Sequence, residues 1–466
     1  MTNKINWVKL VSNKHCPLYT YGAVIAVRDL VLKNTSINGT FLYEKSVSGE
    51  TYLEQNELNK VMKRVKKHSL KDFEFSLDRC KEQGDKLLRL SLNLNKKNFD
   101  NWNLGKLRDE FSSYFWEYIN MQSFLVTLNL IDWDLTKRVQ NILKGFANVN
   151  DLFFNLSTPN KNHFNSLEQK DFLQIVLRIK QNNFDLNNLP SMVLLSLKNH
   201  SLKYGWINCR HFLEEPWGID YFISRAKNVL AEDIHGKIEH LYKQLENENK
   251  KAEEIVKNLC LSKEESYCID LFRESIYLRN HRKDLLTLSG FYVRPLLKEI
   301  AKRVGMEYFR LIYLTHEEIV QMLNLHINIE ERSSGYTIEM INGKISIYNK
   351  ELHEDKTQIE LNFFKGDIAN KGKVIGKVKI INHKKDLSKV KKGDIIVAGM
   401  TTPDHLIAME QAAGFITDTG GVTCHAAIIA REMNKPCITG TKIATRVLKD
   451  NDLVELDADN GIVKKL

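Results

Sequence analysis

The sequence predicts a multidomain protein in which a large, mainly α-helical region precedes a compact C-terminal α/β domain. The chain has 466 residues, more than one hydrophobic core usually organises, so two or three domains are expected. Apolar residues recur every three or four positions through most of residues 59–330, which is the helical period. Beyond residue 331 the pattern changes to short alternating or β-branched runs separated by glycines, which favours strands.

Residues 1–58 are expected to form a small, mixed head that contains β-structure. The stretches "PLYTYGAVIAVRD" (17–29) and "GTFLYEKSV" (39–47) are rich in aromatic and β-branched side chains. Such side chains fit the pleated, half-buried surface of a strand, so short strands are predicted here.

Residues 59–330 are predicted to form a helical domain. Near its middle, Ile234 and Ile238 begin a row of apolar residues at helical spacing, with charged residues between them. The whole chain has only seven prolines, so long helices are rarely interrupted. Within "LTHEEI", Thr315 is followed three residues later by Glu318, the spacing of a helix capping box.

Residues 331–364 are predicted to be a β-hairpin followed by a charged connector. The hairpin is expected near 336–349, where apolar and polar residues alternate on either side of Asn342-Gly343. That pair favours a tight two-residue turn, because both residues tolerate positive φ angles. The stretch "ELHEDKTQIELNFF" (351–364) then resembles a linker.

Residues 365–466 are predicted to form an α/β domain of about 100 residues, a common domain size. Strands are expected at "GKVIGKVKII", "GDIIVAGM", "AAGFITD", "KPCITG" and "DLVELDADNGIV", with helices at "PDHLIAMEQA" and "CHAAIIAREMN". This segment has 17 basic and 12 acidic residues, so it carries half of the chain's net charge of +10.

The composition indicates a reduced, cytoplasmic protein without a membrane or nucleic-acid partner. Lys and Arg are interleaved with Asp and Glu, which is typical of a solvated surface rather than a nucleic-acid-binding stripe. No apolar run approaches the ~20 residues that span a bilayer, and the N-terminus lacks the apolar core of a signal peptide. The seven cysteines are scattered and never form CxxC, so neither a disulfide framework nor a metal site is expected.

One histidine stands in a distinctive local context. Gly420 and Gly421 allow a sharp turn with exposed N–H groups, and Thr423 is placed to cap the helix that follows. His425 would then lie in the first helical turn, where unpaired N–H groups and the helix dipole favour negative charge. That position suits a neutral imidazole that becomes anionic by accepting a phosphoryl group; the alternative is a histidine that is merely packed locally.

The stretch "TDTGGVTCHAAIIAREMNKPCITG" (417–440) closely resembles the phosphohistidine signature of the swivelling domain in phosphoenolpyruvate synthase, pyruvate phosphate dikinase and rifampicin phosphotransferase. The resemblance covers essentially all of residues 365–466. It implies that His425 is the phosphoryl carrier, on Nε2, that Thr423 and Cys424 flank it, and that Gly420 and Gly421 shape its loop. Arg431 falls where the family motif also has arginine; the alternative for Arg431 is a surface cation.

A second stretch, Leu271 to Ile319, resembles the segment that precedes the swivelling domain in phosphoenolpyruvate synthase-like proteins. Arg273 and Glu274 match an "RE" pair of that family, which implies a place near the transferred phosphoryl group. The family often has a basic residue at the position of Tyr277, so this chain departs from the pattern there.

Three further arginines in this stretch are candidates for binding the acceptor or its phosphate: Arg279, Arg282 and Arg294, the last beyond a bend expected at Gly290. Convergent guanidinium groups suit phosphoryl transfer, because the transition state spreads charge over several oxygens. The alternative, for these and for the RE pair, is an ion-paired helix surface. His281 is expected to be exposed.

An aromatic-rich stretch, "KYGWINCRHFLEEPWGIDYFI" (203–223), offers a candidate lining for an acceptor pocket. Aromatic residues at such spacing are more often part of a core, which is the interpretation favoured here.

The resemblance implies a phosphotransferase whose other parts lie elsewhere. No ATP-grasp domain and no Walker-type loop can be recognised, and no phosphoenolpyruvate-binding barrel is expected because the chain ends at Leu466. We therefore expect the acceptor-binding and phosphocarrier part of a split enzyme. A separate ATP-grasp partner, using ATP and Mg²⁺, would phosphorylate His425, and the small domain would swing on the connector to a small-molecule acceptor in the helical domain.

Two alternatives remain open. One is a non-catalytic, regulatory phosphocarrier that accepts the phosphoryl group but passes it to no small molecule. The other is a component similar to enzyme I of a sugar phosphotransferase system, charged by phosphoenolpyruvate.

Overall fold

The computed structural model of the chain describes residues 5, 7–12, 15–30, 41–48, 50–209, 212–230, 233–321, 329–352, 361–381, 384–401, 405–421 and 424–466. The chain divides into two compact units. The helical unit comprises residues 15–48 and 54–350, and the C-terminal unit comprises residues 1–14, 49–53 and 351–466. Residues 353–360 of the predicted connector lie outside the described residues.

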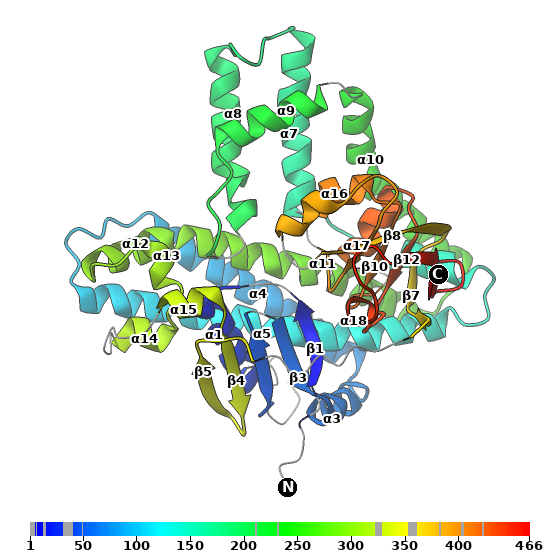
Figure 1. Cartoon of the computed structure of the whole chain (residues 1–466), viewed down its shortest axis with the longest axis horizontal. Coiled ribbons are helices and arrows are strands. Elements are labelled where there is room, and N and C mark those ends of the chain that lie inside the picture. The colour runs from blue at the N-terminus through cyan, green and yellow to red at the C-terminus, as the bar shows by residue number, and fades with distance from the viewer. Residues whose placement is uncertain are drawn as a thin grey trace. The chain divides into compact units, whose positions relative to one another are not determined.

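Three long helices form the base of the helical unit: α4 (Leu70–Asn95), α5 (Leu104–Ile142) and α11 (Lys263–Tyr292) pack against one another (Figure 1). A Cβ atom at Gly84 would lie 2.5 Å from Leu285 Cδ1, so the glycine allows α4 and α11 to approach closely. Helix α5 buries a row of aromatic side chains: Phe111, Tyr114, Phe115, Tyr118 and Phe124. These aromatic residues supply much of the apolar area that holds the three helices together.

A second group of helices in this unit consists of α7 (Phe164–Gln181), α8 (Ser191–Tyr204), α9 (Ile219–Val229) and α10 (Ile234–Asn258), drawn in green in Figure 1. They enclose a core of their own: Phe172, Val176, Ile179, Val193, Leu197, Phe222, Ala226, Ile234 and Ile238. The helical spacing of apolar residues predicted along α10 is confirmed, since its first two periodic residues lie in this core.

The other helices of the unit are shorter. They are α3 (Gln55–Val65), α6 (Val149–Leu156), the 3₁₀ helix η1 (Gly205–Cys209), α12 (Arg294–Arg303), α13 (Tyr308–Leu311), α14 (His316–Gln321) and α15 (Ile329–Ser334). The predicted capping box is confirmed at α14: Thr315 N–H donates to Glu318 Oε2 at 2.7 Å, and Glu318 N–H donates to Thr315 Oγ1 at 3.2 Å. Among the described helices, none has both the length and the apolar character needed to cross a bilayer.

The prediction of a strand at residues 17–29 is wrong, because this segment forms helix α1 (Pro17–Asp29). Pro17 occupies the first turn, where its missing N–H costs nothing. Leu18, Val24 and Ala26 are fully buried, and burial extends around most of the helix. A helix buried on most sides shows no apolar stripe, so local composition alone pointed to the wrong structure.

The predicted hairpin is confirmed. Strand β4 (Thr337–Ile341) pairs antiparallel with β5 (Lys344–Tyr348), and Asn342 and Gly343 form the turn with φ angles of 52° and 75°. Strand β2 (Glu44–Val47) pairs antiparallel with the other edge of β4, so the predicted strand content of the head is also present.

The C-terminal unit is built around an eight-stranded sheet of order β6-β13-β12-β8-β9-β10-β11-β7. Its strands are β6 (Phe363–Lys365), β7 (Asp367–Asn370), β8 (Lys373–Ile381), β9 (Ile395–Ala398), β10 (Gly414–Thr417), β11 (Cys437–Thr439), β12 (Leu453–Asp457) and β13 (Ile462–Lys465). The central strands β8, β9, β10 and β11 run parallel, and the outer pairings are antiparallel.

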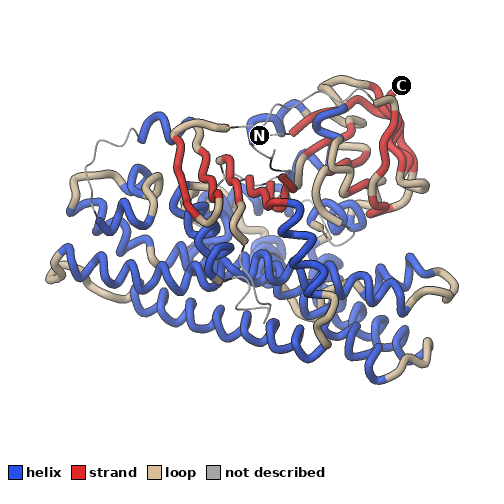
Figure 2. The backbone as a smooth tube through the Cα atoms, turned by 90° about the horizontal axis from the view of Figure 1, so that it is seen from below, coloured by secondary structure: helices blue, strands red, loops and turns tan. Residues whose placement is uncertain are grey.

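Short helices complete this unit: the 3₁₀ helix η2 (Lys384–Lys389), α16 (Leu406–Gln411), α17 (His425–Glu432) and α18 (Ala444–Val447). Strand β1 (Trp7–Ser12) lies next to β3 (Glu50–Glu54) in a separate sheet. Figure 2 shows the strands of the eight-stranded sheet gathered near the C-terminus. The predicted α/β character of residues 365–466 is therefore confirmed.

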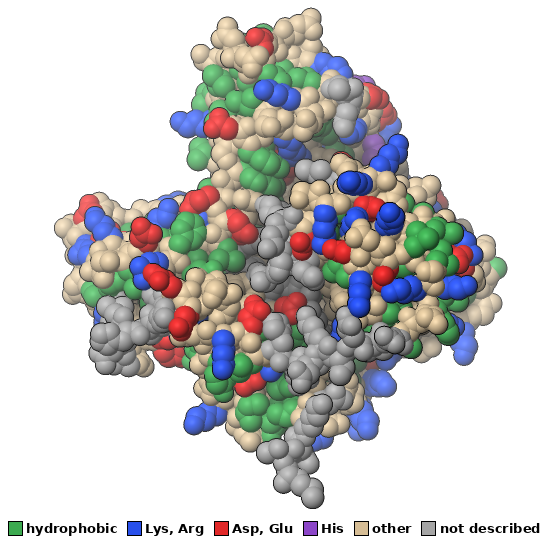
Figure 3. All heavy atoms as spheres, viewed as in Figure 1, with side chains coloured by type: hydrophobic (Ala, Val, Ile, Leu, Met, Phe, Trp, Pro, Cys, Tyr) green, Lys and Arg blue, Asp and Glu red, His purple; other side chains and the backbone are tan. Residues whose placement is uncertain are grey.

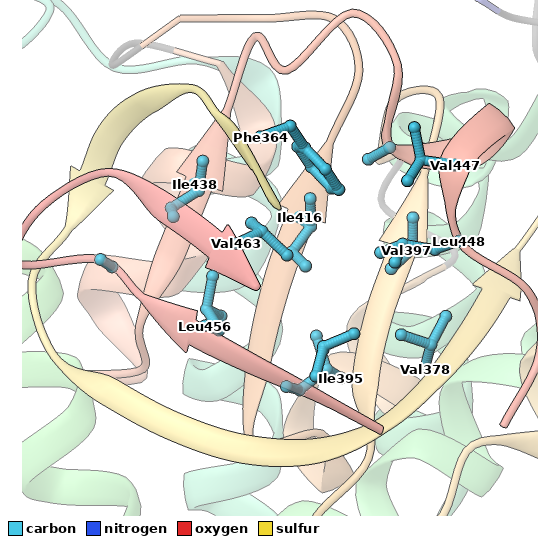
Figure 4. Packing of buried hydrophobic residues seen from close by; sticks show 13 residues of the cluster. Phe364, Val378, Ile395, Val397, Ile416, Ile438, Val447, Leu448, Leu456 and Val463 are labelled. Carbon is cyan, nitrogen blue, oxygen red and sulfur yellow. The ribbon is translucent and has the colours of Figure 1, made fainter. Parts of the chain in front are cut away.

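Side chains of the parallel strands alternate between two cores. Ile395, Val397, Ile416 and Ile438 point to one face, where they pack with residues from the antiparallel strands and α18 (Figure 4). The intervening side chains, among them Phe415, pack on the opposite face against α16 and α17. Both faces of the parallel strands are thus covered, as is usual for such sheets.

The charges of the C-terminal unit are interleaved, as the sequence predicted. On the face visible in Figure 3, Lys and Arg side chains are mixed with Asp and Glu. Among the ion pairs of this unit are Lys373 with Glu455 at 2.8 Å and Lys389 with Asp450 at 2.8 Å.

Candidate functional site

The predicted carrier residue lies at the carboxyl edge of the parallel strands. Strand β10 ends at Thr417, and α17 begins at His425, with the glycine pair in the loop between them. Neighbouring strands β9 and β11 end at the same edge, at Ala398 and Thr439. In open α/β sheets this edge is where ligands usually bind, because loops and helix N-termini meet there. The backbone of His425 lies at this edge, at the start of α17.

Gly420 is required by the shape of this loop. Its φ angle is 107°, and a Cβ atom there would lie 2.8 Å from both Cβ and Sγ of Cys424. Any other residue would therefore combine backbone strain with a clash. Gly421 differs, since no heavy atom lies within 4 Å of a Cβ built at that position. The Gly421 carbonyl accepts a hydrogen bond of 3.0 Å from the Cys424 N–H, which closes the turn into the helix.

Hydrogen bonds fix the start of the loop. The Thr419 N–H and hydroxyl both donate to the Gly399 carbonyl, at 2.9 Å and 2.7 Å. The Asp418 carboxylate, only 9% exposed, accepts bonds from the Thr441 hydroxyl at 3.1 Å and from the Thr445 N–H and hydroxyl. The loop before His425 is therefore anchored to the loops that follow β9 and β11.

The helix start differs in one detail from the sequence prediction. Thr423 lies outside the described residues, and the N-cap position of α17 is Cys424, which makes no side-chain capping bond. The cap is therefore one residue later than predicted. His425 is the first helical residue, as expected for a side chain near the unpaired N–H groups of the first turn. Ala426, Ala427 and Ala430 are buried against the sheet, so α17 lies close to it.

Arg431 lies in the last turn of α17, at the end of the helix opposite His425. Its Nε donates to the carbonyl of Ala369 on β7 at 2.9 Å. Burial lowers the pKa of the Arg431 guanidinium to about 10. Arg431 therefore connects α17 to the sheet. It is partly buried rather than the surface cation of the alternative, and it lies away from the helix start.

In the helical unit, Arg273 and Glu274 are both buried, and both contact the loop that contains Thr158 and Asn160. Arg273 Nε donates to the Thr158 carbonyl at 3.0 Å, and its Nη2 donates to Asn249 Oδ1 at 2.6 Å. Glu274 accepts a hydrogen bond of 3.0 Å from Asn160 Nδ2. The two residues therefore fasten α11 to the turn that precedes α7.

Glu274 is surrounded by cations. Lys81 Nζ lies 3.0 Å and Lys161 Nζ lies 3.1 Å from Glu274 Oε1. Burial would raise the pKa of Glu274, but hydrogen bonds from Lys81, Asn160 and Lys161 outweigh it, so the pKa is lowered and the carboxylate stays charged. These three partners were not predicted, because they lie far from Glu274 in sequence and belong to no motif.

Tyr277 and His281 lie on the same side of α11. The Tyr277 ring stacks on His163 at 5.3 Å and on His281 at 5.0 Å between centroids. His281 was expected to be exposed, but it is partly buried against Phe164, and burial lowers its pKa. An aromatic ring thus stands where the related family often has a basic residue.

Arg279 forms a buried ion pair. Its Nη1 donates to Asp132 Oδ2 on α5 at 2.8 Å, and the Asp132 side chain is only 8% exposed. Burial raises the pKa of Asp132, while Arg279 opposes that shift. This pair matches the structural alternative for Arg279.

Arg282 and Arg294 are buried without complete hydrogen bonding. Their exposures are 5% and 4%, and Nε and Nη1 of each lack a partner among the described residues. The Arg282 side chain is hydrogen-bonded to that of Tyr19, and Arg294 donates from Nη2 to the Glu214 carbonyl and lies over the Tyr308 ring. The predicted bend at Gly290 is displaced, since α11 continues to Tyr292 and the break occurs at Val293.

The aromatic stretch 203–223 belongs to the core, as favoured. Tyr204, Trp206, Phe212 and Phe222 are buried, and Trp217 stacks on Tyr221 with centroids 4.3 Å apart. In the described part of the chain, no group of three or more His, Cys, Asp or Glu side chains is arranged to hold a metal ion.

Comparisons with known proteins agree with the resemblance. Residues 390–461 match the family model for the mobile domain of phosphoenolpyruvate (PEP)-utilising enzymes. A probable phosphoenolpyruvate synthase of Archaeoglobus fulgidus is 54% identical over 99 residues, 21% of this chain and 13% of that protein. The phosphoenolpyruvate synthase of Pyrococcus furiosus is 34% identical over 183 residues, 36% of this chain and 22% of that protein. The uncharacterized phosphotransferase YvkC of Bacillus subtilis is 42% identical over 108 residues, 23% of this chain and 13% of that protein.

The matched region spans less than a quarter of the length of each of these relatives. The 183 residues aligned with the Pyrococcus protein are more than residues 351–466 contain, so part of that similarity lies outside this segment.

Proposed function

We propose that this protein is the acceptor-binding and phosphocarrier part of a split phosphotransferase, because residues 390–461 match the mobile domain of phosphoenolpyruvate-utilising enzymes. His425 is the residue that is transiently phosphorylated. A separate ATP-grasp protein supplies the phosphoryl group from ATP with Mg²⁺, and the helical unit holds the small-molecule acceptor.

The observation that carries this proposal is the backbone setting of His425. It is the first residue of α17, directly after the turn that only Gly420 can make, at the carboxyl edge of parallel strands. The first-turn N–H groups and the helix dipole stabilise a phosphoryl group there and disfavour a positively charged imidazole. The same setting therefore favours the neutral nucleophile before transfer and the charged product after it.

The reaction consists of two transfers. In the first, a lone pair of the neutral imidazole forms an N–P bond, while a P–O bond of ATP breaks and its electron pair stays on the nucleotide oxygen. In the second, an oxygen of the acceptor forms a new P–O bond, the N–P electron pair returns to the imidazole, and the acceptor loses its hydroxyl proton to solvent. Uptake requires the unprotonated ring, because only that form has the lone pair that attacks phosphorus.

The acceptor side of the proposal rests on the cationic surroundings of the RE pair. Lys81 and Lys161 flank Glu274, and Arg273 lies next to it on α11. Positive charge of this kind stabilises a transferred phosphoryl group.

A labelling experiment tests the donor and the carrier together. The purified full chain is mixed with Mg²⁺, a cell extract from its native host as the source of the donor protein, and either radioactively labelled ATP or radioactively labelled phosphoenolpyruvate. We expect label from ATP that is stable in alkali and lost in acid. The label is retained in His240→Ala, which removes an exposed histidine of α10, and is absent in His425→Ala.

Label from phosphoenolpyruvate alone would favour the enzyme I-like alternative. Absence of label from both donors, in the wild-type chain, contradicts the carrier proposal.

One observation favours the regulatory phosphocarrier as the second candidate. Arg273, Glu274 and Arg279 already have protein partners in the helical unit, so their charges are partly satisfied without an acceptor. Such a protein would accept label from ATP but would release it only as inorganic phosphate. Recovery of a labelled organic phosphate from the reaction separates the transferase from this candidate.

A further inference from the structure

The helical unit contains two buried arginines whose hydrogen-bonding capacity is only partly used. Arg282 on α11 is 5% exposed and Arg294 on α12 is 4% exposed. Nε and Nη1 of both guanidinium groups lack a hydrogen-bond partner among the described residues. Buried polar groups are nearly always hydrogen-bonded in native proteins, so unused donors of this kind indicate a missing partner.

The charges are also incompletely balanced. Among the described residues, the partner found for the Arg282 guanidinium is the uncharged Tyr19 side chain. Arg294 Nη1 lies 3.7 Å from Glu215 Oε2, but the Glu215 side chain is 58% exposed. A buried charge without a close counter-charge costs several kcal/mol, of the order of the whole stability of a typical domain. A bound anion would lower this free-energy cost by supplying the missing counter-charge.

Further unused groups surround Arg282. The Tyr118 side chain is fully buried on α5, and its hydroxyl has no partner. The rings of Tyr118 and Tyr19 lie 6.3 Å apart between centroids, and the Tyr19 side chain is hydrogen-bonded to Arg282, so Tyr118 lies near Arg282. Arg282 and Tyr118 therefore offer several donors in one buried region.

Arg294 adjoins the same region through Phe212. The rings of Phe212 and Tyr118 lie 5.3 Å apart, and the Phe212 carbonyl accepts a hydrogen bond of 2.9 Å from the Tyr308 hydroxyl. The Arg294 guanidinium lies 5.6 Å from the centre of the Tyr308 ring. The two arginines thus adjoin one continuous aromatic cluster, defined here as Tyr19, Tyr118, Phe212 and Tyr308.

We propose that this buried arginine cluster binds a small oxyanion, the phosphate or carboxylate group of a metabolite. The Arg282 guanidinium binds the anion, the Tyr118 hydroxyl donates a further hydrogen bond, and Arg294 adds positive charge beside the same aromatic cluster. Guanidinium groups match such anions because their N–H donors form parallel bonds to two oxygens. Ordinary apolar packing does not account for four unused donors on two buried cations.

The inference rests on the proposed function where it concerns the acceptor. It names the acceptor class as a small molecule that carries an anionic group, in addition to the hydroxyl that receives the phosphoryl group. Binding of the anion itself does not require phosphorylation of His425.

Thermal unfolding of the full chain tests the proposal with inorganic phosphate as the probe. Phosphate is titrated at constant ionic strength with chloride as the balancing anion, and sulfate and acetate are measured in separate series. We expect phosphate to raise the midpoint of the helical unit, since a ligand bound only by the folded state stabilises it. A response to phosphate and sulfate identifies a site for tetrahedral oxyanions, and a response to acetate identifies a carboxylate site.

Two variants make the test specific. Arg282→Met should lower the phosphate affinity by at least about tenfold, because it removes a charge-assisted bond. In buffer without oxyanions the same variant should be as stable as the wild type or more stable, since it removes an unpaired buried charge. Arg310→Met is the matched control: Arg310 is exposed on α13, and its variant should bind phosphate as the wild type does.

The proposal is overturned if chloride stabilises the wild-type chain as much as phosphate does, or if Arg282→Met keeps the full phosphate response. Should Arg282→Met fail to fold, Arg282→Lys is held to the same criterion, because lysine retains the charge and loses the planar fork. The two proposals fail separately. Anion binding without labelling of His425 refutes the carrier function alone, and labelling without a response to phosphate, sulfate or acetate refutes the anion site alone.

Discussion

Glu44 on β2 makes the stability of the helical unit depend on pH. Its side chain is fully buried, and neither carboxylate oxygen has a hydrogen-bond partner among the described residues. Burial raises the pKa of Glu44 to about 8, from a usual value of 4.5. The folded protein therefore keeps a proton on Glu44 at pH values at which the unfolded chain has lost it.

The sign and size of the effect follow from this difference. Between pH 4.5 and about 8 the unfolded state binds fewer protons, so the free energy of unfolding falls as pH rises. The slope is about 1.4 kcal/mol per pH unit, which gives a total loss of roughly 4–5 kcal/mol across the window. Below this window the contribution of Glu44 is fully favourable. Glu44→Gln keeps the shape of the protonated acid and removes the titration.

Urea unfolding of the full chain, followed by tryptophan fluorescence, measures this effect. The signal reports mainly the helical unit, which contains every tryptophan except Trp7. We expect Glu44→Gln and wild type to have similar stability near pH 4.5, and the variant to be more stable by roughly 4 kcal/mol near pH 8. Glu307→Gln, which changes an exposed carboxylate, should show no such trend. A difference between Glu44→Gln and wild type that stays constant across this range would refute the reasoning.

Two further predictions concern the carrier loop and the buried ion pair. Gly420→Ala should lower the stability of the C-terminal unit by roughly 1–3 kcal/mol, because of its φ of 107° and the contact with Cys424, whereas Gly421→Ala should have a much smaller effect. Chemical denaturation followed by circular dichroism measures both, and equal effects would contradict the assigned geometry. Arg279→Met should cost about 3–5 kcal/mol by leaving Asp132 buried and unpaired, and Asp132→Asn in the same chain should restore much of the loss. No recovery in the double variant, measured by the same method, would show that the pair is not the cause.

The parts of the fold that were predicted correctly are those that a few neighbouring residues in the sequence specify. The hairpin turn at Asn342-Gly343 is specified by the conformational freedom of those two residues, and the capping box at Thr315 by one short-range pattern. Helix α1 was missed because it is buried on most sides, so its sequence is apolar all round and lacks the periodic stripe that identifies a surface helix. That burial depends on the rest of the helical unit.

In the candidate site, too, features set by a local motif could be predicted and features set by distant packing could not. The setting of His425 follows from a contiguous motif, so its position at a helix start could be predicted. The partner of Arg279 lies 147 residues away in sequence, on α5, and the lysines around Glu274 come from two other elements. Such pairs are created by the packing of distant helices, which a single sequence does not reveal.

The burial of Arg282 and Arg294 could not be predicted for a related reason. Both belong to a basic stretch that is typical of an exposed helix surface, yet both lie inside the helical unit. Only the packing of α5, α11 and α12 shows that their charges are enclosed.

The most direct test of the central claim is the occupancy of His425 in cells. The chain is isolated from its native host at alkaline pH, which preserves phosphohistidine, digested, and analysed by mass spectrometry. We expect the peptide that contains His425 to carry the mass of one phosphoryl group, and brief acid treatment to remove it. A His425 peptide that is unmodified in cells under every growth condition tested, while the protein is folded and expressed, would contradict the account.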